Sequence, residues 1–390
     1  MRRLLLLALP LLLTGCQSTP AEKSAGTSVR FATYNTSLYS DEDGGLIARL
    51  NADDVKARQI AAVIQHQRPD VLLLNEFDYD DRQVAAEIFQ RNYLEVGQFG
   101  QAPIRYPYRY LAPVNTGVPS GMDLDHDGKI EGGSDAFGFG LHPGQYGMLV
   151  LSRFPIEAAP VRTFQNFAWK DLPGAFIPMD PKTGAAWYLP EVWAKLRLSS
   201  KSHWDVPIKT PVGTVHFLVD HPTPPVFDGP EDRNGRRNHD EIRLWAEYIS
   251  AGEKPWLCDD QGRCGGLPAD ALFVIAGDQN ADPVDGDSRS NAITQLLDHP
   301  RVLRYSAPES EGAVVAAQAT GGSNRTHKGS SARDTGDFGP KVGNLRLDYL
   351  LPSVGLSVRA SGVFWPKPGE VGADWIDATD HHMVWVDLTR

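Results

Sequence analysis

Polar side chains that can carry out hydrolysis stand at the ends of six short apolar runs in this sequence. Four runs lead into such groups, which are Asn35, Glu76, Asp220 with His221, and Asp278 with Asn280. Two further runs follow them, one after Asp348 and one after Asp380 with His381. Carboxylate and amide oxygens are hard ligands that suit a cation such as Mg2+, and a carboxylate or an imidazole can orient water or move a proton. We therefore expect these residues to form one hydrolytic site.

Phosphoester hydrolysis is one reaction that would use all of these groups together. It requires a hard cation to neutralise charge on the phosphoryl oxygens, a group to orient or deprotonate water, and donors for the remaining oxygens. Magnesium keeps several of its waters and takes few protein oxygens. Glu76 and Asn35 are therefore sufficient as ligands, with Asp380 as a further one.

The apolar runs indicate the elements that must position these groups. Runs rich in Val, Ile, Leu and Phe cover residues 29–34, 71–74, 147–151, 214–219, 271–276, 347–351 and 383–388. Their length and their turn-forming boundaries predict strands that are buried on both faces. Between them, residues 55–67, 82–89 and 236–251 carry apolar positions at helical spacing. Strands that alternate with helices predict a layered α/β protein.

The order of polar group and strand sets the expected strand directions. If the groups meet at one edge, the four strands that precede them point toward that edge and the two that follow them run away from it. This predicts sheets of mixed direction and argues against an all-parallel doubly wound fold. Because the motifs that share this site span residues 29–390, the same reasoning predicts one catalytic domain over that range.

Seven motifs in this order resemble a known superfamily. They are Tyr34-Asn35, Asn75-Glu76, YGMLVLSRFPI at 146–156, VDH at 219–221, GDQN at 277–280, RLDY at 346–349 and TDH at 379–381. In order, spacing and strand context they resemble the endonuclease/exonuclease/phosphatase (DNase I-like) superfamily across residues 29–390. The resemblance implies a four-layer α/β/β/α sandwich of two mixed β-sheets flanked by helices. It also implies a phosphoester hydrolase that uses Mg2+ or Mn2+.

The resemblance implies roles for individual residues as well. Asp278 would orient or activate the attacking water, while Asn280 and His221 would donate hydrogen bonds to the phosphate. Asp348 would hold His381 in one tautomer, which is a usual task for a carboxylate beside an imidazole. His381 would then be either an imidazolium donor to the phosphate or an acid/base group, and both alternatives stay open.

An acidic stretch at residues 123–131 is similar to the front half of an EF-hand calcium loop. Its acidic residues are Asp123, Asp125, Asp127 and Glu131, with a turn glycine at Gly128. Oxygens at this spacing suit the six to eight ligands that Ca2+ takes, so we expect structural calcium here. The loop departs from the pattern at its twelfth position, where Ser134 replaces the usual acid and Asp135 comes one place late. The alternative is a solvated acidic turn.

Several basic groups are candidates for contacts with substrate. Arg233, Arg236 and Arg237 either grip an anionic part of the substrate or form a solvated charge run at the start of a helix. His203 is a candidate residue at the rim of the site. A nuclease needs a basic track with stacking aromatic rings, and the side chains that would supply it are Lys195, Arg197, Lys201, Trp204 and Lys209.

Composition narrows the class of protein but leaves the substrate open. The 390 residues include 38 Lys and Arg against 49 Asp and Glu, and 41% are hydrophobic, as in a folded globular protein. Nucleic acid is the favoured phosphodiester substrate, and the alternatives are a phosphomonoester or a phospholipid or sugar-phosphate diester. A different class, a catalytically inactive calcium-stabilised surface binding protein, is disfavoured because the set of site residues is complete. A monomer is expected.

The start of the chain and its cysteines indicate where it works. Residues 1–15 have two arginines, ten apolar residues and LTG before Cys16, which is similar to a bacterial lipoprotein signal. We expect lipidation of Cys16, a flexible tether over residues 16–28, and an exported protein whose only membrane contact is the lipid. Gln17 favours the outer membrane, on its periplasmic face or at the cell surface. An exported protein can form disulfides, and we expect one between Cys258 and Cys264.

Overall fold

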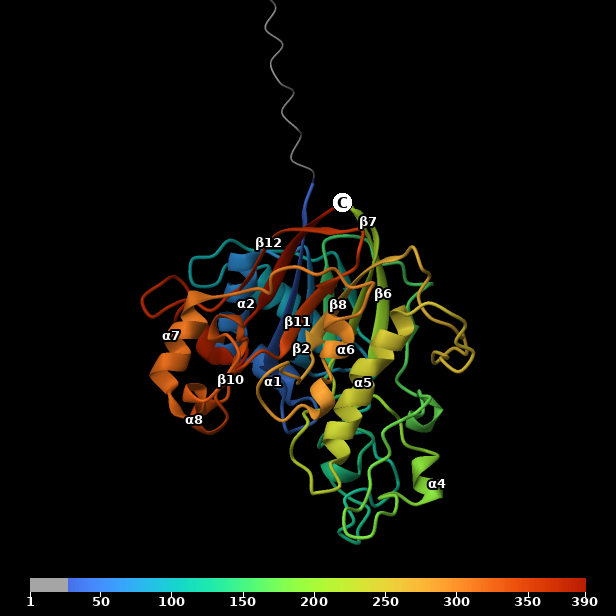
Figure 1. The fold of residues 1–390 in the computed structure, drawn as a ribbon. Coiled ribbons are helices and arrows are strands. Elements are labelled where there is room, and N and C mark those ends of the chain that lie inside the picture. The colour runs from blue at the N-terminus through green and yellow to red at the C-terminus, as the bar shows by residue number, and fades with distance from the viewer. Residues whose placement is uncertain (1–26) are drawn as a thin grey trace, which may run out of the picture.

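The computed structural model describes residues 27–390, and its fold is shown in Figure 1. The predicted signal peptide, Cys16 and most of the predicted tether lie outside the described residues. Within residues 27–390, no helix has both the length and the apolar character that crossing a bilayer would demand.

The first sheet has six strands in the order β12-β13-β1-β2-β4-β3. Their bounds, in that order, are Ser357–Val363, Val384–Thr389, Val29–Leu38, Val71–Phe77, Met148–Ser152 and Tyr108–Tyr110. Strand β1 pairs parallel with β2 and antiparallel with β13. The sheet is therefore mixed, as predicted.

The second sheet has five strands in the order β11-β8-β7-β6-β5. Their bounds, in that order, are Asp348–Pro352, Leu272–Asp278, Gly213–Asp220, His203–Thr210 and Arg162–Thr163. Strands β7 and β8 are parallel, and β11 runs antiparallel to β8. A separate two-stranded ribbon joins β9 (Gly336–Asp337) to β10 (Asn344–Leu345).

Alternating side chains on the central strands build the layers. On β1, Phe31 faces the core between the two sheets while Ala32 faces the core under the outer helices. On β8, Val274 faces the same inner core and Phe273 faces the opposite helical layer. Because each strand is apolar on both faces, its sequence is a continuous run without polar alternation.

Helices cover the outer face of each sheet. Those on the first sheet are α1 (Gly45–Asn51), α2 (Val55–Gln67), α3 (Val84–Ile88) and a π-helical turn, Phe89–Leu94. Those on the second sheet are α5 (Arg233–Ile249) and α6 (Thr294–Leu297). The remaining α-helices are α4 (Pro190–Trp193), α7 (Glu311–Thr320) and α8 (Gly339–Val342). The result is the predicted four-layer α/β/β/α sandwich.

The long loops that interrupt the strands carry a small core of their own. Met122 and Leu124 pack there with Tyr188 and Leu196. The two loops that contribute these residues lie with α4 at the lower end of the molecule in Figure 1. The predicted disulfide between Cys258 and Cys264 is formed.

All seven strands predicted from apolar runs are present, and six further strands were not predicted: β3, β5, β6, β9, β10 and β12. Strand β6 was hidden by Asp205, Pro207 and Lys209, which interrupt its apolar positions. Asp205 is tolerated because it accepts hydrogen bonds from Tyr248 Oη at 2.6 Å and makes a 2.7 Å contact with His216 Nδ1. The helix predicted at residues 82–89 is shorter as an α-helix and continues as the π-helical turn.

Candidate active site

Strand register brings the predicted residues to one edge of the two sheets. Asn35 lies opposite Asn75 in the parallel pair β1 and β2. Asp348, at the start of β11, lies opposite Asp278, at the end of β8. The strand directions thus agree with the prediction from the order of polar group and strand.

Asp278 lies at the centre of this site and is almost fully buried. Its Oδ2 accepts a hydrogen bond from Asn35 Nδ2 at 3.0 Å. The same oxygen lies 3.4 Å from Nε2 of His221 and 3.5 Å from Nε2 of His381. Its second oxygen, Oδ1, accepts from the backbone N–H of Asn280 at 2.9 Å. Both oxygens of one carboxylate are therefore fixed by groups from four separate segments.

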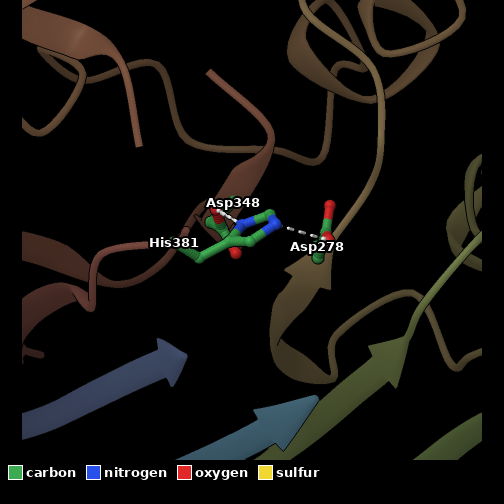
Figure 2. A group of neighbouring side chains, drawn as sticks. All are labelled: Asp278, Asp348 and His381. Carbon is green, nitrogen blue, oxygen red and sulfur yellow. Dashed lines mark hydrogen bonds and ion pairs between the residues drawn. The ribbon is translucent and has the colours of Figure 1, made fainter. Parts of the chain in front are cut away.

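His381 is held between two carboxylates, as Figure 2 shows. Its Nδ1 lies 2.8 Å from Oδ2 of Asp348, and its Nε2 faces Asp278. Thr335 Oγ1 donates to the same oxygen of Asp348 at 2.7 Å and accepts from the backbone N–H of Leu347 and of Asp348. This chain of contacts fixes the orientation of the imidazole ring.

The buried charges of these groups stabilise one another. Burial disfavours the charged form of His381, but Asp348 and Asp278 outweigh it and raise the pKa of the imidazole well above its ordinary value. Burial also works against the charge of Asp278, yet His381, His221 and Asn35 together hold the pKa of this carboxyl below its usual range. The pKa of Asp348 is raised by burial, although His381 opposes that shift. The site thus favours an imidazolium facing an ionised Asp278.

Glu76 and Asp380 provide oxygens on the neighbouring side of the site. The charges of both act on Tyr39 and on Lys56, so the two carboxylates share one region. Asp380 is half exposed and lies 3.9 Å from His381 Nε2. The carboxylate of Glu76 makes no hydrogen bond or ion pair with any residue between 27 and 390. Free, hard oxygens at this place fit a magnesium-type cation, with Asn35 beside them.

A second set of possible ligand atoms overlaps with the histidine network. Asp278, Asp348 and His381 each offer an atom within 4.8 Å of the others. Both ring nitrogens of His381 already face carboxylates, however. These three residues are therefore already engaged with one another, and the oxygens of Glu76, Asn35 and Asp380 are the ones that could hold a metal.

His221 and Asn280 lie next to each other at the ends of the second sheet. Asn280 Nδ2 donates to the backbone carbonyl of Pro222 at 3.1 Å, which ties it to the loop after His221. Asn280 adopts a left-handed backbone conformation with φ of 49°. His221 is buried, and its Nδ1 has no hydrogen-bond partner among the described residues. The two side chains flank Asp278 and can both donate to an anion.

Two supporting residues were not assigned a role from the sequence. Asn75 Oδ1 accepts from the backbone N–H of Asp278, and its Nδ2 donates to the carbonyl of Asp220, both at 3.2 Å. It thereby links the two sheets behind the site. Thr335 was part of an unassigned loop, and nothing in its local sequence indicates the contact with Asp348. His382, in contrast, is buried against Trp365 with ring centroids 3.6 Å apart, a structural role that alternation with His381 had indicated.

The acidic loop assembles a different set of carboxylates from the predicted one. Asp123 and Asp125 meet Asp135, with one oxygen from each within 4.8 Å of the others. Asp127 and Glu131 are exposed and do not join the cluster, and Glu131 pairs with Lys129 at 3.4 Å. Asp135 turns inward because its carboxylate accepts from the backbone N–H groups of Leu124 and Glu131. Asp135, which lies one position after the twelfth position of the EF-hand pattern, is therefore the residue that closes the loop.

The basic candidates for substrate contacts are mostly used within the protein. Arg237 is half-buried and donates to the carbonyls of Phe137, Arg197 and Leu198. Arg233 pairs with Glu231 at 2.5 Å, and Arg236 donates to the carbonyl of Ile177 at 3.0 Å. These contacts support the interpretation as a helix-leading charge run over that of an anion grip.

The predicted position of His203 at the rim is wrong. This residue lies within β6 with 1% of its surface exposed. Its Nδ1 lies 2.6 Å from Ser199 Oγ, and its Nε2 lies 2.9 Å from the carbonyl of Glu241. Trp204 is likewise buried in the inner core, and Lys209 pairs with Glu157 at 3.0 Å. Trp204 and Lys209 therefore do not contribute to the basic and aromatic track expected for a nuclease.

Comparison with solved structures gives weak similarity over nearly the whole chain. An endonuclease/exonuclease/phosphatase protein from Beutenbergia cavernae aligns with a TM-score of 0.52 and 20% identity, covering 93% of this chain and 71% of that one. Sphingomyelinase C from Streptomyces griseocarneus aligns with a TM-score of 0.43 and 17% identity, covering 93% and 99%. A humanized TDP2 from D. rerio aligns with a TM-score of 0.47 and 10% identity, again covering 93% and 99%. The first of these supports the fold alone, and no curated protein sequence matches the chain.

A match to a known family identifies the family of this chain, which similarity of fold alone does not show. Residues 32–381 match the Endonuclease/Exonuclease/phosphatase family. This range begins on β1 and ends at His381, so it contains every residue of the site described above. The chain therefore belongs to the endonuclease/exonuclease/phosphatase family of phosphoester hydrolases.

Proposed function

We propose that this protein is a divalent-metal-dependent phosphodiesterase in which water attacks phosphorus. The observation that carries the proposal is the environment of Asp278. A buried, ionised carboxylate faces two imidazoles and an amide, and a free carboxylate on the neighbouring strand end can hold a metal. This arrangement provides a water-orienting group, phosphate donors and a cation site together.

Each side chain of the site has a distinct task in this proposal. Glu76, Asn35 and Asp380 would hold Mg2+ or Mn2+, which would supply positive charge to the phosphoryl oxygens when bound. Asp278 orients the attacking water. A general base works best with a pKa near the working pH, so the depressed pKa of this carboxyl favours orientation over proton abstraction in the free protein.

The imidazoles and Asn280 act on the phosphate. His221 and the second N–H of Asn280 donate to non-bridging oxygens. His381, held as an imidazolium by Asp348, donates either to a phosphoryl oxygen or to the leaving oxygen as the P–O bond breaks. When the leaving oxygen takes its proton from His381, the proton released by the attacking water restores the imidazolium, and the products of a diester are a phosphomonoester and an alcohol.

The substrate is proposed at the level of the phosphodiester. Nucleic acid was favoured from the sequence, but two of the residues named for its basic and aromatic track, Trp204 and Lys209, do not contribute to it. Phosphomonoesters and phospholipid or sugar-phosphate diesters therefore stand as alternatives that the assay must separate.

The test is hydrolysis by the full chain, purified in mild detergent with Mg2+, Mn2+ or Ca2+. The substrates are bis-p-nitrophenyl phosphate, p-nitrophenyl phosphate and plasmid DNA. Metal-dependent turnover that is lost in Asp278→Ala and His381→Ala, and kept in the control Asp298→Ala, supports the proposal. Asp298 is a suitable control because its side chain is 73% exposed and pairs only with Arg304. Folded protein that hydrolyses none of the three substrates would contradict the proposal and favour the binding-protein alternative.

We also propose that Ca2+ binds the acidic loop as a structural ion. Support comes from the three carboxylates that meet there and from Asp123 Oδ1, a buried oxygen without a hydrogen-bond partner in the described chain. Calorimetry should detect binding, and no heat of binding at millimolar Ca2+ would refute the proposal.

Attachment to the membrane is a separate proposal that rests on the sequence of residues 1–16. We propose export and acylation of Cys16, with the outer membrane as the destination and the lipid as the only membrane contact. Wild type should partition into a detergent phase and Cys16→Ser should not. Equal partitioning of the two would rule the proposal out.

A further inference from the structure

Lys201 is a largely buried lysine without a partner among the described residues. Only 6% of its surface is exposed, and it lies in the segment that leads into β6. Its Nζ makes no hydrogen bond and no ion pair with any residue of the chain from 27 to 390. Lysines are rarely buried to this degree unless they are paired. Nζ is not one of the fully buried atoms that lack a partner in the described chain, so the stem of Lys201 is buried while its ammonium still reaches solvent.

The backbone around Lys201 is fixed from two sides. The carbonyl of Lys201 accepts from the backbone N–H of Asn115 at 2.9 Å. On the other side, the buried carboxylate of Glu241 accepts from the backbone N–H of Ser200 at 2.5 Å and from that of Thr223 at 2.7 Å. Glu241, on α5, therefore holds the segment of Lys201 next to the loop that follows His221. The backbone of Lys201 is consequently held in place next to that loop.

The charges that act on Lys201 are those of the candidate site. Burial lowers the pKa of Lys201, whereas Glu241, Glu76 and Asp278 raise it and Arg237 lowers it further. Glu241 is engaged by two backbone N–H groups, and Asp278 is engaged by Asn35 and the two imidazoles. Once a cation neutralises Glu76, the ammonium has no free counter-charge in its surroundings. The neighbouring Ser200 Oγ donates to the backbone carbonyl of His221 at 3.4 Å, which places the segment of Lys201 beside the candidate site.

We propose that Lys201 is a substrate-binding residue of this site, whose ammonium group donates to a non-bridging oxygen of the substrate phosphate. The inference rests on the proposed function and deepens it, because it assigns an anion contact that lies outside the predicted set of His221, Asn280 and His381. The substrate phosphate supplies the counter-charge that the folded protein lacks. Because no proton needs to leave Lys201, its task is to bind and orient the phosphate.

The test compares the full chain with Lys201→Met, Lys201→Arg and the control Lys170→Met. Lys170 is a suitable control because its side chain is 41% exposed and pairs with its neighbour Asp171. The readouts are kcat and KM on bis-p-nitrophenyl phosphate with Mg2+ or Mn2+, the inhibition constant of inorganic phosphate, and the melting temperature.

We expect Lys201→Met to lower kcat/KM by roughly 10²-fold, in the range found when a single donor to a transition-state oxyanion is removed. Inhibition by inorganic phosphate should weaken at least about tenfold, because the variant lacks a charged donor. Lys201→Arg should recover part of both, and Lys170→Met should match wild type. The melting temperature of Lys201→Met should stay equal or rise, because an unpaired, largely buried lysine has been replaced by an apolar side chain of similar volume.

The outcomes separate this inference from the function on which it rests. Wild type that hydrolyses none of the substrates removes the proposed function itself. Active wild type with a folded Lys201→Met variant of unchanged kcat/KM and unchanged phosphate inhibition overturns only the role of Lys201. Failure of Lys201→Met to fold also overturns it, because the lysine would then be needed for the structure.

Discussion

The strand-end site and the acidic loop at residues 123–135 both gather carboxylates, but the chain brings them together differently. At the strand ends, the residues come from six segments spread between Asn35 and His381, and each is fixed by the register of a buried strand. In the acidic loop, the residues lie within 13 positions of one another, and no strand holds them. The first set comes together as the sequence predicted, whereas in the second set Asp127 and Glu131 lie apart from the cluster of Asp123, Asp125 and Asp135.

The difference shows for which kind of motif the sequence predicts correctly which side chains come together. A strand end is defined by burial on both faces, which leaves little freedom in where its last residue points. A loop closes through local backbone hydrogen bonds, and a shift of one or two residues exchanges the closing ligand. Asp135 takes that place because two backbone N–H groups bind its carboxylate, whereas Glu131 pairs with Lys129 at the surface.

Chelation should have the largest effect and should act differently on the two regions. EDTA is expected to lower hydrolysis of bis-p-nitrophenyl phosphate by at least about 10³-fold, since the metal neutralises charge in the transition state. Adding Mg2+ or Mn2+ should restore activity, while Ca2+ alone should restore only thermal stability. Activity that survives EDTA dialysis would remove the distinction between a catalytic and a structural metal.

Asp278→Asn tests the centre of the strand-end site. We expect kcat/KM to fall by about 10³-fold, because the variant loses the ionised group that orients water and faces His381. Steady-state kinetics beside Asp298→Asn measures the effect, and near-ultraviolet circular dichroism checks that the fold persists. A loss below tenfold would show that the site works without this carboxylate.

Thr335→Val tests whether the support behind His381 matters. The valine has the shape of threonine but cannot donate to Asp348 or accept from the backbone N–H groups of Leu347 and Asp348. We expect about a tenfold loss of kcat, as for other partners that orient a functional group, together with about 1–3 kcal/mol of lost stability. Thr326→Val serves as the exposed control, measured by the same kinetics and by urea unfolding. Unchanged kcat in Thr335→Val would make Asp348 sufficient by itself.

The smallest effect should come from the acidic loop. Asp135→Asn is expected to abolish the stabilisation by Ca2+, which would be about 2.7 kcal/mol for wild type at 100 times the dissociation constant. Asp127→Asn should keep that stabilisation, and both variants should keep wild-type activity. Differential scanning calorimetry with and without Ca2+ measures this. Should Asp127→Asn lose the effect and Asp135→Asn retain it, the EF-hand spacing would be the better guide.

Burial on both faces of the strands made most of the fold predictable from the sequence, as it did for the residues at the strand ends. The continuous apolar runs of β1, β2 and β8 are the direct result of burial on both faces. Strand β6 was not predicted, because Pro207 interrupts its apolar pattern. Its buried Asp205 also needs a hydrogen bond from Tyr248, which lies 43 positions away in the sequence. Such a partner is not visible in a local pattern.

The same limit applies to the site. Asn35, Glu76 and Asp278 were predicted because each ends a recognisable strand. Thr335 was not assigned a role, because its role comes from the contact with Asp348. Lys201 was named only as part of a basic track for nucleic acid, because its burial beside α5 is not visible in the sequence. Lys201 also looked like one surface charge among several, and only its burial separates it from the exposed lysines.

The direction of β1 has a practical consequence for handling this protein. Val29 pairs with Leu388, so both ends of the described chain leave from the same edge of the first sheet, as Figure 1 shows for the C-terminus. Asn35 lies six residues further along the strand, about 20 Å from that edge. A bead, electrode or display scaffold joined at either end of the described chain would therefore cover the edge of the sheet where Val29 and Leu388 lie. The opposite edge, where Asn35 lies, would stay open to bulky reactants.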